Sequence, residues 1–256
     1  MPLIKTSNPA LGENTFRDVA GSRFGGAIDT TRRMTLSGTV NKTGILLVLA
    51  AAGAAWTWER FLSTRDLAAV GPLLLVGFLG GFIVAMVTVF KKEWSPVTAP
   101  AYALLEGLAL GGLSAVFDLR YPGIAFQAVG LTFGTLFAML LLYKSGLIAV
   151  TQKFRMGIIA ATGGIMVFYL AEMVLGFFGI RFMTINGAGP IGIAFSFFVV
   201  AIAALNLVLD FDFVERGANY GAPKYMEWYA AFGIIVTLVW LYLEILRLLS
   251  KMRSRS

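Results

Sequence analysis

Seven long apolar stretches, separated by short polar connections, constrain the fold of this chain more than any other feature. A helix needs about 20 mostly apolar residues to cross a bilayer, whereas barrel strands would alternate over about ten. The chain is 58% hydrophobic and 14% charged, while a soluble domain carries about 25% charged residues. We therefore expect an all-α polytopic membrane protein. Its predicted spans are Thr43–Trp58, Val70–Phe90, Ala99–Phe117, Ile124–Tyr143, Gly157–Phe178, Ile191–Leu209 and Tyr229–Leu249.

The connections between these stretches are too short to hold a soluble domain. We expect residues 1–42 to form a cytoplasmic tail, residues 43–250 the seven-helix domain and residues 251–256 a basic tail. Four apolar residues recur at roughly helical spacing in the first tail: Phe16, Val19, Phe24 and Ile28. This spacing fits an amphipathic helix on the membrane surface and equally a disordered tail.

The distribution of basic residues predicts the orientation in the membrane. The formal net charge is +7, and lysines and arginines collect in loops that stay cytoplasmic. They gather in residues 1–42 and after the second, fourth and sixth stretches, which predicts a multi-pass plasma-membrane protein with a cytoplasmic N-terminus. Because membrane orientation accounts for the net positive charge, we expect no nucleic-acid partner. Four C-terminal cations would lie outside, unless the last stretch is re-entrant: Arg247, Lys251, Arg253 and Arg255.

Two glycines in the third stretch, Gly107 and Gly111, form a small-xxx-small pattern. Such a pattern lets the backbones of neighbouring membrane helices approach closely. We expect these glycines to serve helix packing, with a hinge as the alternative.

Acidic residues inside the apolar stretches are the candidate functional groups, because an ionised side chain at the bilayer centre costs roughly 2.5 kcal/mol or more. At 1.5 Å per helical residue, Glu106 lies about 10 Å from the inner end of its stretch. Asp210 ends the sixth stretch, and Asn206 lies one turn away on the same face. We expect these three residues to form a polar layer on the cytoplasmic side, within reach of Lys91 or Lys92.

A second polar layer is expected towards the outer side. Glu172 and Glu244 lie at similar depths in the fifth and seventh stretches, and Tyr169 is one turn from Glu172. Arg247 follows Glu244 by three residues, so the two side chains share a face and are expected to pair. The loop after the sixth stretch is expected to hold three solvated charges, Asp212, Glu215 and Arg216.

The residue types that are absent limit the chemistry. The chain has no His and no Cys, which removes the usual proton shuttle, thiolate metal sites and the His that a membrane serine protease needs. Retinal binding would need a lysine deep in the last stretch, but the first lysine there is Lys251, at its end. We therefore expect no enzyme and no cofactor. Oxygen ligands remain, and they suit Ca²⁺ as a possible permeant ion.

Three segments together resemble the Bax inhibitor-1-like family, also called the transmembrane Bax inhibitor motif family. They are the pair Glu106-Gly107, the run Leu207-Val-Leu-Asp210-Phe-Asp212, and the run Trp240-Leu-Tyr-Leu-Glu244-Ile-Leu-Arg247. The resemblance covers about residues 35 to 250 and looks closest to the bacterial branch. It implies six helices packed around a central last helix. It also implies a pH-sensitive calcium leak, and in bacterial relatives the regulation of a membrane protease.

The resemblance also implies a pH sensor made of two aspartates, with an arginine from the end of the second helix nearby. Asp210 matches the first aspartate, and Lys91 or Lys92 stands at the place of the arginine. One alignment puts Glu244 at the second aspartate, and another puts Thr237 there. The two positions are seven residues apart, so they share a helical face but not a depth.

We interpret the chain first as a pH-sensitive Ca²⁺ leak channel gated by buried carboxylates. A non-conducting regulator that binds another membrane protein, such as a membrane protease, is the alternative, and a proton-coupled transporter is the third. The predicted sensor comprises Asp210, Glu244, Lys91 and Lys92. The predicted ion pathway comprises Glu106, Asn206, Glu172 and Thr237, with Asp210 and Glu106 as candidate Ca²⁺ ligands.

The predicted topology can be tested with single cysteines, because the native chain has none. A cysteine in place of Arg65 should react with a membrane-impermeant maleimide added outside intact cells. A cysteine in place of Val150 should react only after the membrane is opened. Equal labelling of both positions from outside would rule out a cytoplasmic N-terminus.

Overall fold

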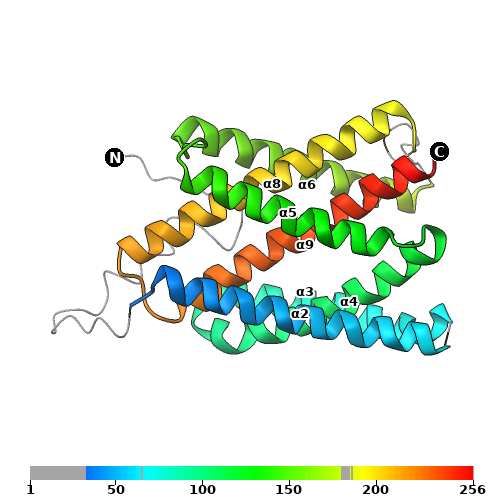
Figure 1. Cartoon of the computed structure of the whole chain (residues 1–256), viewed down its shortest axis with the longest axis horizontal. Coiled ribbons are helices and arrows are strands. Elements are labelled where there is room, and N and C mark those ends of the chain that lie inside the picture. The colour runs from blue at the N-terminus through cyan, green and yellow to red at the C-terminus, as the bar shows by residue number, and fades with distance from the viewer. Residues whose placement is uncertain (1–32, 65, 180–184, 186, 256) are drawn as a thin grey trace. The chain divides into compact units, whose positions relative to one another are not determined.

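The computed structural model describes residues 33–64, 66–179, 185 and 187–255. Within them, seven helices are long and apolar enough to cross a membrane, and the only extended pairing is a single bridge between Arg33 and Pro223. The helices, shown in Figure 1, are α2 (Leu36–Thr64), α3 (Leu67–Phe90), α4 (Ser95–Arg120), α5 (Ile124–Lys144), α6 (Gln152–Phe177), α8 (Pro190–Asn219) and α9 (Met226–Arg253). A short 3-10 turn, η2 (Lys92–Trp94), precedes α4. The all-α fold with seven spans is therefore confirmed.

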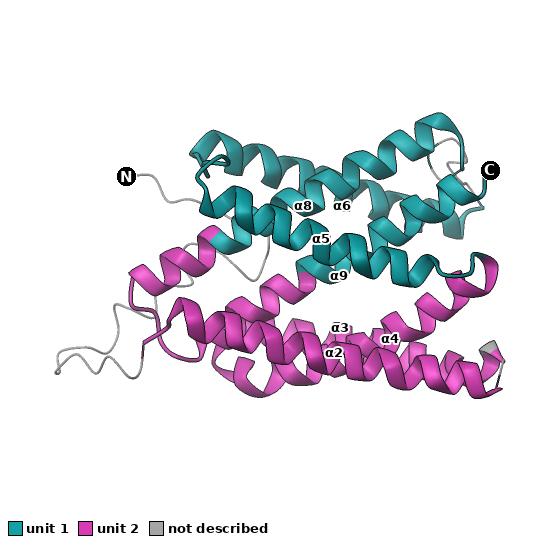
Figure 2. Ribbon diagram, viewed as in Figure 1, with its two compact units in different colours: residues 1–8, 121–211, 237–256 teal, residues 9–120, 212–236 magenta. Residues whose placement is uncertain are grey.

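The chain divides into two compact units, coloured separately in Figure 2. The described residues of unit 1 are 121–179, 185, 187–211 and 237–255, and those of unit 2 are 33–64, 66–120 and 212–236. Both α8 and α9 contribute to each unit. In the most apolar window of α9, 67% of the residues are buried, against 11% for α6. A helix at the centre of a bundle must be more buried than its neighbours, and α9 is more buried than α6. The arrangement of six helices around α9 stays a prediction.

Several helices extend beyond the apolar stretches of the sequence. Helix α2 begins at Leu36 rather than Thr43, so the expected tail boundary at residue 42 falls inside a helix. Helix α8 continues to Asn219 and therefore includes Asp212 and Arg216, which pair at 3.1 Å one turn apart. The expectation that these charges lie in a loop was wrong, because polar residues can continue a helix past the apolar core. Glu215 is exposed, as expected of a solvated charge. The four apolar residues of the N-terminal tail lie outside the described residues.

Glycines bring α2, α3 and α4 of unit 2 close together. A Cβ atom on Gly107 would collide with the backbone of Ala50, and one on Gly111 with the backbone of Ala54. Both neighbours belong to α2. On the other side of α4, a Cβ on Gly77 of α3 would reach the backbone of Leu105. Backbone packing is therefore the role of the Gly107–Gly111 pattern, as the sequence predicted.

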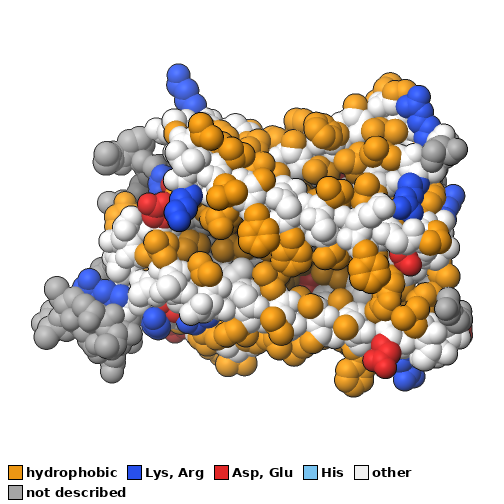
Figure 3. All heavy atoms as spheres, in the orientation of Figure 1, with side chains coloured by type: hydrophobic (Ala, Val, Ile, Leu, Met, Phe, Trp, Pro, Cys, Tyr) orange, Lys and Arg blue, Asp and Glu red, His pale blue; other side chains and the backbone are white. Residues whose placement is uncertain are grey.

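The surface matches helices that lie in lipid. Figure 3 shows hydrophobic side chains over the middle of the helices, with charged side chains near the helix ends. Large apolar residues such as Phe82, Phe126 and Phe197 are mostly exposed. In water such a surface would be an aggregation hazard, but in a bilayer it is the contact with acyl chains.

Replacing Gly107 with Ala should destabilise the protein by about 1–3 kcal/mol, because the new methyl group must push two backbones apart. Gly130→Ala in α5 is the matched control, since a Cβ there meets nothing within 4 Å. It should be neutral or slightly stabilising through its better helix propensity. Thermal unfolding in detergent measures both variants, and equal stability would argue against backbone packing at Gly107.

Candidate functional site

Asp210 is a buried carboxylate of α8 in unit 1, and its side chain is only 3% exposed. It accepts a hydrogen bond from the side chain of Thr237 in α9. Its Oδ2 atom has no hydrogen-bond partner among the described residues. Buried polar atoms normally have a partner, so an unpaired carboxylate oxygen points to a proton, a water or an ion.

The hydrogen bond from Thr237 favours the alignment that places Thr237, rather than Glu244, opposite Asp210. Asp210 lies nine residues before the end of α8, and Thr237 lies eleven residues after the start of α9. Glu244 lies two turns further along α9, about 10 Å from Thr237 at 1.5 Å per residue. Among the described residues of α9, the one that faces Asp210 is therefore Thr237, whose side chain is not a carboxylate.

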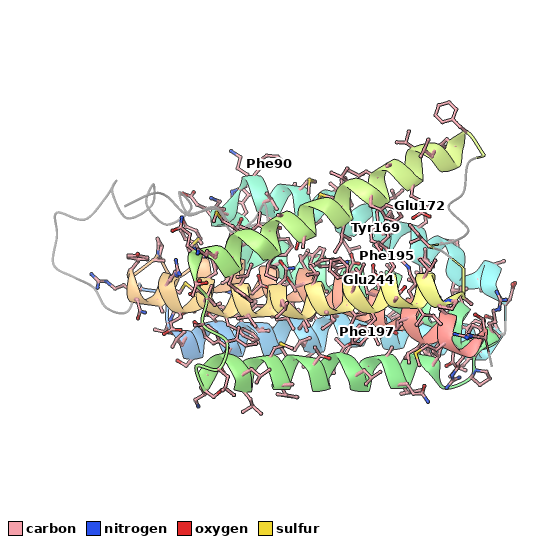
Figure 4. The ribbon with its side chains drawn as sticks, turned by 90° about the horizontal axis from the view of Figure 1, so that it is seen from above. Phe90, Tyr169, Glu172, Phe195, Phe197 and Glu244 are labelled. Carbon is pink, nitrogen blue, oxygen red and sulfur yellow. The ribbon has the colours of Figure 1, made fainter. Side chains whose placement is uncertain are left out.

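Glu244 belongs to a different cluster, between α6 and α9 of unit 1. Its side chain is buried, and Figure 4 shows Tyr169 and Glu244 close together. The Tyr169 hydroxyl donates to Glu244 Oε1 over 3.0 Å, and Arg247 Nη1 donates to the same oxygen over 3.0 Å. The indole of Trp240 provides a further hydrogen bond. The expected pairing of Glu244 with Arg247 is confirmed.

Arg247 also binds Tyr169 directly, so each of the three side chains Tyr169, Glu244 and Arg247 contacts the other two. Its Nη1 atom donates to the Tyr169 hydroxyl over 2.6 Å, and its guanidinium lies 5.0 Å from the centre of the tyrosine ring. Glu172, one turn further along α6, acts electrostatically on Tyr169 and Lys251. Tyr169, Glu244 and Arg247 thus form a satisfied, neutralised group that joins two helices.

Three of the C-terminal cations have partners in unit 1. Lys251 is buried, and its Nζ donates to the carbonyls of Ile185 and Gly192 and to the Ser196 hydroxyl, at 2.8–3.2 Å. Arg253 donates to the Pro122 carbonyl over 2.8 Å. Arg247 pairs with Glu244. Because α9 is one unbroken helix to Arg253, Lys251 lies in a helix rather than in a tail. The side of the membrane on which α9 ends stays a prediction.

The remaining predicted residues are spread over both units. Asn206 belongs to unit 1, where its amide donates to the Thr162 hydroxyl of α6 over 2.8 Å. Lys92 belongs to unit 2, where its Nζ lies 5.9 Å from the centre of the Tyr229 ring. Lys91 follows the last residue of α3 as its C-cap, and Glu106 lies on α4 in the same unit. The pairing of Asp210 with Lys91 or Lys92, and its approach to Glu106, stay predictions.

Sequence reasoning missed Glu227, a fully buried carboxylate in the first turn of α9. It accepts hydrogen bonds from the Thr35 backbone and hydroxyl, both over 2.8 Å, and it binds Lys42 and Lys224. Lys224 lies three residues before Glu227, which was the available signal, but Lys42 and Thr35 come from a distant part of the chain. The cluster fixes the start of α2 to the start of α9 within unit 2.

The described carboxylates do not form a metal-binding cluster. Among the described residues, no three carboxylates gather in a way that could hold a metal ion. The Ca²⁺ ligands expected at Asp210 and Glu106 therefore stay a prediction.

Tyr225 lies in the connection between α8 and α9. Its pKa is raised mainly by burial and also by the nearby Glu93 carboxylate. The carbonyl of Tyr225 accepts a hydrogen bond from Ser95 over 3.0 Å.

Replacing Arg247 with Leu should destabilise the protein by about 1–3 kcal/mol, because it leaves the buried Glu244 without its cation. Adding Glu244→Leu should recover part of that loss, since both charges are then gone. A double-mutant cycle of unfolding in detergent measures the coupling. Strictly additive effects would show that the pair contributes nothing to stability.

A family model described as Bax inhibitor 1 like matches residues 8–254. No curated protein and no solved structure matches the chain. Because the family model covers nearly the whole sequence, this seven-helix membrane protein belongs to the Bax inhibitor 1 like family.

Proposed function

We propose that this protein is a pH-sensitive cation leak channel for Ca²⁺ and that Asp210 is its proton sensor. The observation that carries the proposal is the buried Asp210 carboxylate, whose Oδ2 atom lacks a hydrogen-bond partner among the described residues. Thr237 supplies one hydrogen bond to this side chain. Because Asp210 has only this one hydrogen bond from the described part of the chain, it can gain or lose a proton without breaking a network of contacts. Glu244 and Glu227 each have several hydrogen bonds and ion pairs that a change of charge would disrupt.

The proposed mechanism uses one proton. When Asp210 is ionised, its charge needs a cationic or donor partner, and Lys91 or Lys92 is the candidate for closing the pore. When Asp210 is protonated, that attraction is lost and the balance between closed and open states shifts. Ca²⁺ is the transported substrate, and oxygen atoms suit such a hard cation. The protein is then not an enzyme, needs no cofactor, and lies in the plasma membrane with a cytoplasmic N-terminus.

The sensor that the family resemblance implies has two aspartates, whereas Asp210 of this chain faces Thr237. Two aspartates that face each other titrate as a coupled pair, in two steps. A single aspartate that faces a threonine titrates in one step. We therefore infer a pH response that follows one protonation rather than two.

In proteoliposomes, Asp210→Asn should remove the pH dependence of Ca²⁺ flux. Asparagine resembles the protonated acid, so the variant should show at every pH the flux that the wild type shows at low pH. Asp212→Asn is the matched control, two residues along and paired on its own helix with Arg216, and it should keep the wild-type profile. An unchanged profile in Asp210→Asn would remove this residue from the mechanism. Flux that is absent in the wild type would favour the membrane-protein regulator instead.

Substitutions at Thr237 test the one-proton sensor. Thr237→Asp should broaden the pH profile into two steps, because it creates a coupled pair of carboxyl groups. Thr237→Ser keeps the hydroxyl and should keep the single step. Glu244→Gln should alter stability and leave the shape of the profile unchanged. A profile that changes in Glu244→Gln but not in the Thr237 variants would return the second sensor position to Glu244.

A further inference from the structure

Glu106 is a carboxylate of unit 2 that the proposed mechanism does not use. It lies eleven residues into α4, about 16 Å from the start of that helix at 1.5 Å per residue. Its side chain is partly buried, and no described residue forms a hydrogen bond or an ion pair with it. An intramembrane acid without any partner is a candidate functional group.

The contrast with Glu227 in the same unit is informative. Glu227 is buried with two lysines and with the hydroxyl and backbone amide of Thr35, so its negative charge is fully compensated. Glu106 has no such compensation within the described residues. On its own helix, the nearest titratable neighbour is Tyr102, one turn earlier, which packs edge-on against Phe232 of α9 at 4.9 Å. A tyrosine hydroxyl supplies no positive charge.

Helix α3 covers the Glu106 carboxyl group with a glycine. A Cβ atom on Gly81 would lie 2.9 Å from Glu106 Oε2, so the carboxyl group occupies space that only glycine leaves free. The next nearest atoms belong to the backbone of Glu106 and to the Leu105 side chain. Helix α3 places no charged group against the acid, because its apolar run extends from Leu67 to Phe90.

We propose that Glu106 is a proton-binding site, held as a neutral carboxylic acid in the glycine notch that Gly81 opens in α3. A metal cation would need several oxygen ligands, and no cluster of three acidic residues exists among the described residues. A proton needs only the one carboxyl group. The proposal does not depend on conduction or on Asp210.

Carbodiimide labelling tests the proposal directly, because dicyclohexylcarbodiimide enters membranes and adds to protonated carboxyl groups. Purified full-length protein in proteoliposomes is treated at several pH values, and the modified peptides are identified by mass spectrometry. Glu106 should be modified at neutral pH, with labelling lost as the pH rises well above neutral. Glu244, which is ion-paired with Arg247, should remain unmodified, and the Glu106 label should be absent in Glu106→Gln.

Two adjacent glycines provide the matched variants. Gly81→Ala should reduce Glu106 labelling, since the methyl group forces the carboxyl group out of the notch. Gly80→Ala should leave it unchanged, because a Cβ there meets only the flexible Leu105 side chain at 3.3 Å. The proposal is overturned if Glu106 labels only at acidic pH, as an ordinary exposed acid would. Equal labelling in both alanine variants would overturn the role of the notch.

Discussion

The cost of removing carboxylates from water is the constraint on which the polar interior of this protein depends. Each buried acid meets that cost differently. Glu227 is surrounded by lysines and by Thr35, and Glu244 is bound by tyrosine, tryptophan and arginine. Asp210 receives one hydrogen bond from Thr237. The fully compensated acids fix helices to one another, whereas the sparingly compensated Asp210 is the acid that we propose as the proton sensor.

Much of the fold was predictable, because spans in lipid must be long, apolar and helical. The pairing of Glu244 with Arg247 followed from their three-residue spacing, and the packing role of Gly107 followed from its motif. Helix ends were harder, since the apolar pattern stops where lipid stops, but the hydrogen-bonded backbone continues. Helix α8 shows this, because it carries Asp212 and Arg216 well beyond Leu209.

The polar contacts between distant segments were not predictable from a single sequence. Thr237 and Glu244 occupy the same face of α9, so periodicity alone could not choose between them as the partner of Asp210. The choice depends on depth, which is set by where α8 and α9 begin and end. Glu227 was missed for a similar reason, since Thr35 and Lys42 reach it from residues nearly 200 positions earlier in the chain.

The attachment of Lys251 has a consequence for how this protein can vary. Two of its three acceptors are the main-chain carbonyls of Ile185 and Gly192, which every amino acid presents. Ile185 lies in the segment that connects α6 to α8, so a different side chain at that position leaves its carbonyl in place as an acceptor. Gly192 lies in the first turn of α8, so a change in the length of that segment would move the Ile185 carbonyl relative to the Gly192 carbonyl. Substitution of Ile185 should accordingly be tolerated, whereas a change in the number of residues between Ile185 and Gly192 should not be, which a library of substitutions and single-residue deletions would separate.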